Sequence, residues 1–166
     1  MDILVVSDTH GRRDRLSAVA ARSPAGVLLF LGDGLRDLDV ISDAVTVRAV
    51  RGNCDFCGRD VPEERVEDFG QYRIFMTHGH RYGVKGSRAA AIAAAARAEA
   101  DVLLYGHTHI PNITYLAKGE SVGSAVLKKP MIVFCPGSLG EPRDGVATFG
   151  TLTLRDNGIL PGIGTF

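Results

Sequence analysis

The chain has 166 residues, of which 45% are hydrophobic and 23% charged, and this composition excludes an intrinsically disordered protein. Nineteen basic and nineteen acidic side chains give zero net charge, which argues against charge-driven binding to nucleic acid. No charge-free apolar run reaches about 18 residues, and the N-terminus lacks a signal-peptide pattern. The three cysteines suit a reducing compartment. We therefore expect one cytoplasmic domain over residues 1–166, with no membrane association.

The first half of the chain alternates between short apolar runs and amphipathic segments. The apolar runs predict strands at 3–6, 27–31 and 45–50, and the segments between them predict helices at 12–22 and 35–43. This alternation is typical of an α/β protein with parallel strands.

The second half changes to hairpins and one alanine-rich helix. Further strands are predicted at 65–69, 72–77, 102–105, 113–116, 131–134 and 147–154. Alanine is the best helix former, so residues 87–100 predict a helix, and residues 118–129 predict an exposed loop or hairpin tip. The whole pattern predicts an α/β fold with mixed sheets, packed as a sandwich with helices outside.

Most of the predicted strands end in a polar cluster flanked by glycine. These clusters are Asp8-Thr9-His10-Gly11, Gly32-Asp33-Gly34, Gly52-Asn53, His78-Gly79-His80 and Gly106-His107-Thr108-His109. All five histidines of the chain lie in three of them. Because ligands of open α/β folds gather at the carboxyl ends of the strands, the clusters predict one site.

The residue types in these clusters suit divalent metal ions. Carboxylate, amide and imidazole donors favour Mn, Fe, Zn or Ni over metals that prefer thiolate. Seven ligands are too many for one ion and about right for two ions that share an aspartate. The candidate ligands are Asp8, His10, Asp33, Asn53, His78, His107 and His109. As alternatives, each aspartate could cap a helix, and Gly52-Asn53 could simply form a turn.

The ordered motifs D-x-H, G-D, G-N, H-G-H and G-H-x-H resemble those of the calcineurin-like metallophosphoesterases, and most closely the small YfcE-type phosphodiesterases of bacteria and archaea. The resemblance runs from Asp2 to about Arg143 and includes Val50-Arg51-Gly52-Asn53-Cys54-Asp55 and Cys135-Pro136-Gly137-Ser138. It implies a four-layer α/β/β/α sandwich of two mixed β-sheets flanked by helices.

The resemblance also implies a mechanism at two divalent metal ions, with manganese expected first. Asp8, His10, Asp33 and His109 would hold one ion, and Asp33, Asn53, His78 and His107 the other. A hydroxide bridging the ions would attack the phosphorus of a small phosphodiester or nucleotide-type substrate. Branch members are often oligomers, so a homo-oligomer is a further expectation.

Three residues are expected near the chemistry itself: Asn53, Cys54 and His80. Many family members carry histidine at the position of Cys54, although the YfcE-type branch often has cysteine there. A thiol is a weak acid, which would favour esters with good leaving groups. His80 has no ligand position in the family pattern, so it either contacts substrate, supports a ligand or is structural.

Several other readings stay open at this point. Cys54 and Cys57 have the C-x-x-C spacing of redox or zinc sites. Arg51, Arg81 and Arg143 either hold a substrate phosphate or are surface charges. The alternative functions are a phosphomonoesterase and a non-catalytic scaffold, like the retromer subunit of this fold. A metallo-β-lactamase-type hydrolase is disfavoured because the contiguous H-x-H-x-D-H run is missing.

Overall fold

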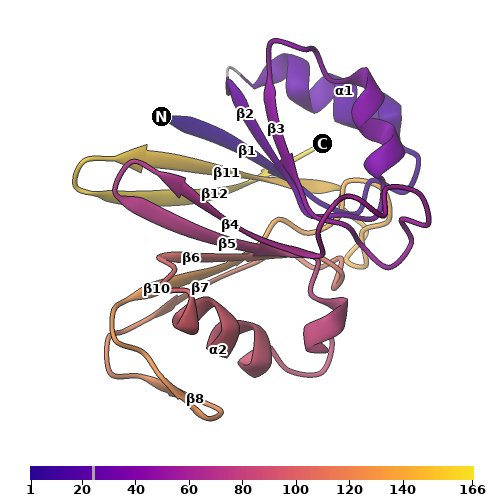
Figure 1. Cartoon of the computed structure of the whole chain (residues 1–166). Coiled ribbons are helices and arrows are strands. Elements are labelled where there is room, and N and C mark those ends of the chain that lie inside the picture. The colour runs from indigo at the N-terminus through magenta and orange to yellow at the C-terminus, as the bar shows by residue number, and fades with distance from the viewer. Residues whose placement is uncertain (24) are drawn as a thin grey trace.

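The computed structural model describes residues 1–23 and 25–166, which form two five-stranded sheets (Figure 1). The first sheet has the order β12-β11-β1-β2-β3. Its strands are β1 (Asp2–Val6), β2 (Val27–Phe30), β3 (Thr46–Ala49), β11 (Thr148–Arg155) and β12 (Gly158–Thr165). The first three are parallel to one another, whereas β11 pairs antiparallel with both β1 and β12, so the sheet is mixed.

The second sheet has the order β4-β5-β6-β10-β7 and is also mixed. Its strands are β4 (Glu64–Phe69), β5 (Tyr72–Thr77), β6 (Val102–Tyr105), β7 (Asn112–Leu116) and β10 (Met131–Cys135). A small hairpin of β8 (Ser121–Val122) and β9 (Ala125–Val126) lies between β7 and β10 in the chain. This hairpin confirms the exposed tip predicted at 118–129.

Four helical segments accompany the sheets. They are α1 (Arg13–Arg22), η1 (Leu35–Val40), η2 (His80–Tyr82) and α2 (Ala89–Arg97), of which the two η segments are 3-10 helices. Figure 1 shows the sheets face to face, with α1 outside the first and α2 outside the second. None of the helices in the described ranges is long and apolar enough to cross a membrane.

The side chains of β1 show why the layers form. Successive residues of a strand point to opposite faces, and all four positions from 3 to 6 are apolar and buried. Ile3 and Val5 enter the core between the sheets, whereas Leu4 and Val6 pack with Leu16 of α1. The strand is therefore covered on both faces.

The second sheet has the same two-sided construction. Ile74 and Met76 of β5 face the core between the sheets, and Phe75 faces the outer core with Ala91 and Ala95 of α2. The predicted four-layer α/β/β/α sandwich is thus confirmed.

Three predictions about the elements need correction. The segment predicted as a helix over 35–43 is a 3-10 helix that ends at Val40, and the helix predicted over 87–100 is shorter, Ala89–Arg97. The strand β12 was not predicted at all, because Pro161 and three glycines interrupt its apolar pattern. Its place at the edge of the sheet explains why proline is tolerated.

Candidate metal centre

The polar clusters predicted from the sequence meet at one place in the structure. They follow β1, β2 and β3 in the first sheet and β5 and β6 in the second, and these strands are parallel within each sheet. Two three-residue groups, Asp8-His10-His109 and Asp33-His78-His107, each offer ligand atoms that all lie within 4.8 Å of one another. The two groups are joined by Asp33, as its contacts show.

The carboxylate of Asp33 lies between the two groups. Its Oδ2 is 3.3 Å from Nε2 of His78 and 3.9 Å from Nε2 of His10. The amide oxygen of Asn53 adds a further donor atom, 3.2 Å from Nε2 of His78. All seven candidate ligands therefore converge, and Asp33 has the position expected of a shared ligand.

Asp8 provides the strongest sign that a cation belongs here. Its side chain is fully buried, and among the described residues its Oδ1 has no hydrogen-bond partner. That oxygen faces Nε2 of His109 at 3.0 Å, of His10 at 3.8 Å and of His78 at 3.9 Å. A buried carboxylate oxygen without a partner is costly, and three inward imidazole nitrogens around it form a donor set that fits a divalent ion.

Two of the imidazoles are oriented by backbone carbonyl groups. Nδ1 of His78 donates to the carbonyl of Leu31 at 2.7 Å, and Nδ1 of His109 donates to the carbonyl of Glu141 at 2.6 Å. Because a carbonyl can only accept, the proton of each neutral ring sits on Nδ1. The inward Nε2 atoms are then free to bind a metal.

The backbone of the candidate ligands is strained. Six non-glycine residues in the described ranges have a left-handed φ, and five of them are candidate ligands: Asp8 (54°), His10 (43°), Asp33 (57°), His107 (66°) and His109 (60°). Such conformations are uncommon outside glycine and cluster at functional sites. The fold holds these residues in conformations that turn their side chains toward one point.

Two glycines, Gly52 and Gly106, allow their loops to pack closely against the loops that carry Asp33 and Asp8. A Cβ atom on Gly52 would lie 2.1 Å from Oδ1 of Asp33. A Cβ atom on Gly106 would lie 2.0 Å from Oγ of Ser7. Any side chain at these two positions would push the loops that carry the aspartates apart.

Asp55 is a supporting residue to which sequence reasoning gave no role. Its carboxylate accepts hydrogen bonds from the backbone N–H groups of Asp33 (2.8 Å), Gly34 (2.8 Å), Leu35 (2.9 Å) and Gly52 (2.9 Å). It therefore fixes the loop after β2 to the loop after β3. Its place two residues after Asn53 was the only signal for it in the sequence.

The late Pro-Gly-Ser motif also supports the site. Oγ of Ser138 donates to the backbone carbonyl of Asp8 and accepts from the N–H of Glu141, both at 2.8 Å. Ser138 thereby links the loop of Asp8 to the segment whose carbonyl orients His109. Cys135 is buried in the outer core beside α2, which indicates a structural role.

Burial and the charges in the site shift the pKa values of its groups in different directions. Burial raises the pKa of Asp8, but His10, His109 and His78 outweigh burial and hold that pKa below its usual range. The nearby carboxylate of Asp8 raises the pKa of His10. For His78, Asp33 and Asp8 overcome burial and raise the pKa. Burial and the neighbouring His78 lower the pKa of His107 to about 4.

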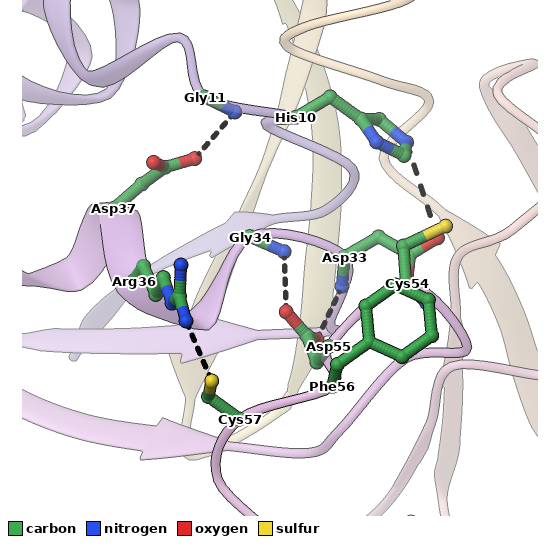
Figure 2. Close-up of a pocket in the computed structure, with 10 residues that line it drawn as sticks. All are labelled: His10, Gly11, Asp33, Gly34, Arg36, Asp37, Cys54, Asp55, Phe56 and Cys57. Atoms are coloured by element: carbon green, nitrogen blue, oxygen red, sulfur yellow. Dashed lines mark hydrogen bonds and ion pairs between the residues drawn. The ribbon is translucent and has the colours of Figure 1, made fainter.

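Cys54 lies beside the first group (Figure 2). Its Sγ and the ligand atoms of His10 and Asp33 all lie within 4.8 Å of one another. Burial and the carboxylate of Asp33 raise the pKa of Cys54 to about 11, so the thiol stays protonated and is a weak acid. Its backbone N–H donates to Oδ1 of Asp33 at 2.7 Å. The structure places Cys54 next to the candidate ligands, and its catalytic role stays a prediction.

His80 lies next to the second group without belonging to it. Its ring centroid is 5.4 Å from that of His78 and 6.2 Å from that of His107. Nε2 of His80 is 3.8 Å from the carboxylate of Glu63, and its Nδ1 is buried without a partner among the described residues. Its role also stays a prediction.

Two of the three arginines considered for phosphate binding pair with a carboxylate. The guanidinium groups of Arg51 and Arg81 both bind Glu63, at 2.8 Å and 2.9 Å. The backbone N–H of Arg143 donates to the carbonyl of His109 at 3.2 Å. The second cysteine of the C-x-x-C pair, Cys57, accepts a hydrogen bond from Arg36, and both cysteines are free thiols.

Comparison with known proteins agrees with this geometry. A model of the calcineurin-like phosphoesterase superfamily domain matches residues 1–157. The chain belongs to this superfamily. The probable metallophosphoesterase YsnB of Bacillus subtilis is 33% identical over 159 residues, covering 95% of this chain and 86% of YsnB. Phosphodiesterase YfcE of Escherichia coli is 30% identical over 190 residues, covering 96% of this chain and 90% of YfcE.

A solved structure supports the same assignment. A conserved protein of Streptococcus pneumoniae, described as a predicted phosphoesterase, superposes with a TM-score of 0.78 at 27% identity, covering 99% of this chain and 88% of the other. The resemblance inferred from the motifs is confirmed. Membership of this superfamily supports a metal-dependent phosphoester hydrolase.

Proposed function

We propose that this protein is a phosphodiesterase that uses two divalent metal ions. The observation that carries the proposal is the carboxylate of Asp33, which lies between two separate groups of donors. Paired ions about 3.5–4 Å apart, joined by a shared carboxylate, are a common device for displacement at phosphorus.

The donor atoms divide naturally between two ions. Asp8, His10, Asp33 and His109 would hold one, and Asp33, Asn53, His78 and His107 the other. Such ions, when bound, polarise the phosphoryl oxygens and activate water. Oxygen and nitrogen donors accept several metals, and Mn²⁺ is the first that we would supply.

The residues of the chain do three things for this reaction. The backbone carbonyls of Leu31 and Glu141 keep two imidazoles facing inward. Asp55 and the glycines keep the aspartate loops together. The protonated thiol of Cys54 donates weakly to a leaving group, which favours esters whose leaving group needs little help.

A diester is favoured over a monoester for two reasons. The relative YfcE is named a phosphodiesterase. In addition, the carboxylate of Glu141 lies 4.0 Å from Nε2 of His10 and disfavours the second negative charge of a monoester. A phosphomonoesterase and a non-catalytic scaffold are the two alternatives that an assay must separate from this proposal.

The test is hydrolysis of bis(p-nitrophenyl) phosphate and p-nitrophenyl phosphate by chelated protein, with and without added Mn²⁺. We expect turnover only with metal, and faster turnover of the diester. Faster monoester turnover would contradict the diesterase assignment and leave the metal site intact. No turnover in protein shown to hold two ions would favour the scaffold.

A variant pair ties this activity to the site. Asp33→Asn keeps the size of the side chain but removes the shared charge, so we expect activity to fall by at least about 100-fold. Asp14→Asn is the control, because the carboxylate of Asp14 is 63% exposed and forms an ion pair with Arg12. Equal activity of the two variants would exclude Asp33 from the reaction.

A further inference from the structure

A pocket of about 260 Å³ opens beside the candidate metal ligands. Its lining includes His10, Asp33 and Cys54 together with Arg36, Phe56 and Cys57, and Figure 2 shows Phe56 on the side of Cys54 and Arg36 on the other side. A phosphoryl group bound at the metal ligands would have its organic substituent next to this pocket. The volume lies just below the range of about 300–1,000 Å³ that is usual for whole drug-sized ligands, so it suits a single ring system.

The ring of Phe56 is unusually exposed. It is 85% exposed, more than any other large hydrophobic side chain in the described part of the chain, where Tyr115 comes next at 66%. Its neighbour Asp55 anchors the loop through four backbone hydrogen bonds, and the N–H of Phe56 donates to the carbonyl of Cys54 at 3.2 Å. The backbone that carries the ring is therefore anchored beside the pocket, where the ring offers a flat apolar face to a ligand.

Arg36 adds hydrogen-bond donors opposite this face. Among the ten residues that line the pocket it is the only lysine or arginine. Its guanidinium donates to Sγ of Cys57 at 2.6 Å, which fixes it at the rim. The nearby carboxylate of Asp37 is occupied, because its Oδ2 accepts from Thr9 and from the N–H of Gly11. The remaining donors of Arg36 are available to acceptor atoms on the edge of a bound ring.

We propose that this pocket binds a nucleobase, stacked on Phe56 with its acceptor edge toward Arg36. A pocket lined by a flat exposed aromatic ring and by a guanidinium suits a planar heterocycle that carries acceptor atoms. The substrate class is then a nucleoside phosphodiester with one base in the pocket. This inference rests on the proposed function, because it assumes that the phosphoryl group lies at the metal ligands.

The first test compares two cyclic diesters in the Mn²⁺-loaded protein: adenosine 2′,3′-cyclic phosphate and methyl ribofuranoside 2′,3′-cyclic phosphate, which lacks the base. We expect Phe56→Ala to lower the ratio of their kcat/KM values about tenfold, since stacking on an aromatic side chain contributes about 1–3 kcal/mol per base. Phe56→Trp should keep the ratio. Tyr115→Ala removes another exposed ring, on β7 of the second sheet, and should not change it.

The second test needs no turnover. Binding of adenosine 5′-monophosphate and of ribose 5-phosphate is measured by equilibrium dialysis with the Mn²⁺-loaded protein. We expect the nucleotide to bind more tightly, and Phe56→Ala and Arg36→Gln to reduce that preference by about tenfold. A preference that is absent, or unchanged in both variants, would overturn the assignment of the pocket.

The two tests also distinguish failure of this inference from failure of the proposed function. If both cyclic esters are hydrolysed and Phe56→Ala leaves the ratio of their kcat/KM values unchanged, the phosphodiesterase assignment is supported and the base pocket is excluded. Binding of the nucleotide through Phe56, without turnover of any ester, would leave the base pocket standing and remove the phosphodiesterase.

Discussion

Single side chains determine whether this site can hold metal, and Asp55 is the one with the most backbone partners. We predict that Asp55→Asn, whose amide can accept fewer of the four N–H groups, lowers the free energy of unfolding by about 1–3 kcal/mol. Mn²⁺ affinity should fall by about tenfold or more, because the loop of Asp33 loses its support. Calorimetric titration checks this, with Asp14→Asn as control. Unchanged affinity would show that Asp55 does not position the ligands.

The protonation of two histidines predicts how metal binding depends on pH. Because the pKa values of His10 and His78 are raised, each ring of the metal-free protein keeps its second proton to a higher pH than a free imidazole does. A metal must displace these protons, so its apparent affinity should rise with pH through the raised pKa values, by up to about tenfold per pH unit for each ring. His107, with a pKa of about 4, adds nothing in this window.

Calorimetry at pH 6 and pH 8, in buffers of different ionisation enthalpy, measures both the affinity and the protons released. Affinity that is the same at the two pH values, with no proton release, would show that these rings are not displaced by the metal. It would then argue against their assignment as ligands.

Glu141 gives a prediction about substrate charge. Its carboxylate is 64% exposed and lies 4.0 Å from Nε2 of His10, so solvent weakens its field without abolishing it. Glu141→Gln should raise kcat/KM for p-nitrophenyl phosphate relative to the diester by about 3- to 10-fold at low salt, and by less at high salt. An unchanged ratio at low salt would mean that Glu141 does not select between the two esters.

At the scale of elements, the turn between β3 and the site depends on the absence of a side chain at Gly52. We predict that Gly52→Ala lowers the free energy of unfolding by about 1–3 kcal/mol and weakens Mn²⁺ binding, because its Cβ would meet the carboxylate of Asp33. Gly26→Ala is the matched control, since a Cβ there meets nothing within 4 Å, and it should stay within about 0.5 kcal/mol. Chemical unfolding measures both variants, and equal values would contradict this reading of the turn.

Elements with a continuous apolar run could be predicted from the sequence, because a strand covered on both faces has no other simple pattern. This holds for β1, β2 and β6. The polar residues after these strands could be predicted as one site because ligands of open α/β folds gather at the carboxyl ends of the strands. The strand β12 could not, since its glycines and Pro161 are acceptable only at a sheet edge, which is a tertiary fact. Asp55 was missed because its partners are backbone groups from a distant loop.

At the scale of the whole molecule, the candidate centre joins the two sheets. The candidate ligands that follow strands of the first sheet are Asp8, His10, Asp33 and Asn53. Those that follow strands of the second sheet are His78, His107 and His109. An ion held by these residues would have ligands from both halves of the sandwich, and it would stabilise the folded chain but not the unfolded chain. We predict that Mn²⁺ at about 100 times its Kd adds about 2.7 kcal/mol to the free energy of unfolding.

At a fixed Mn²⁺ concentration, this gain should grow between pH 6 and pH 8, because the apparent Kd falls over that range. The raised pKa values of His10 and His78 stabilise the metal-free protein below pH 6.5, and that contribution is lost as the pH rises through them. The metal replaces those protons most readily at the higher pH. Thermal unfolding with Mn²⁺ and with chelator measures the difference, and a gain that shrinks as the pH rises would contradict the assignment.

We propose that two ions act together on a phosphodiester. Hydrolysis of bis(p-nitrophenyl) phosphate tests this in chelated protein that is titrated with Mn²⁺, with bound metal counted at each step. We expect activity to appear mainly as the second equivalent binds, because Asp33 is placed to serve both ions. Full activity at one equivalent, or none at two, would contradict it.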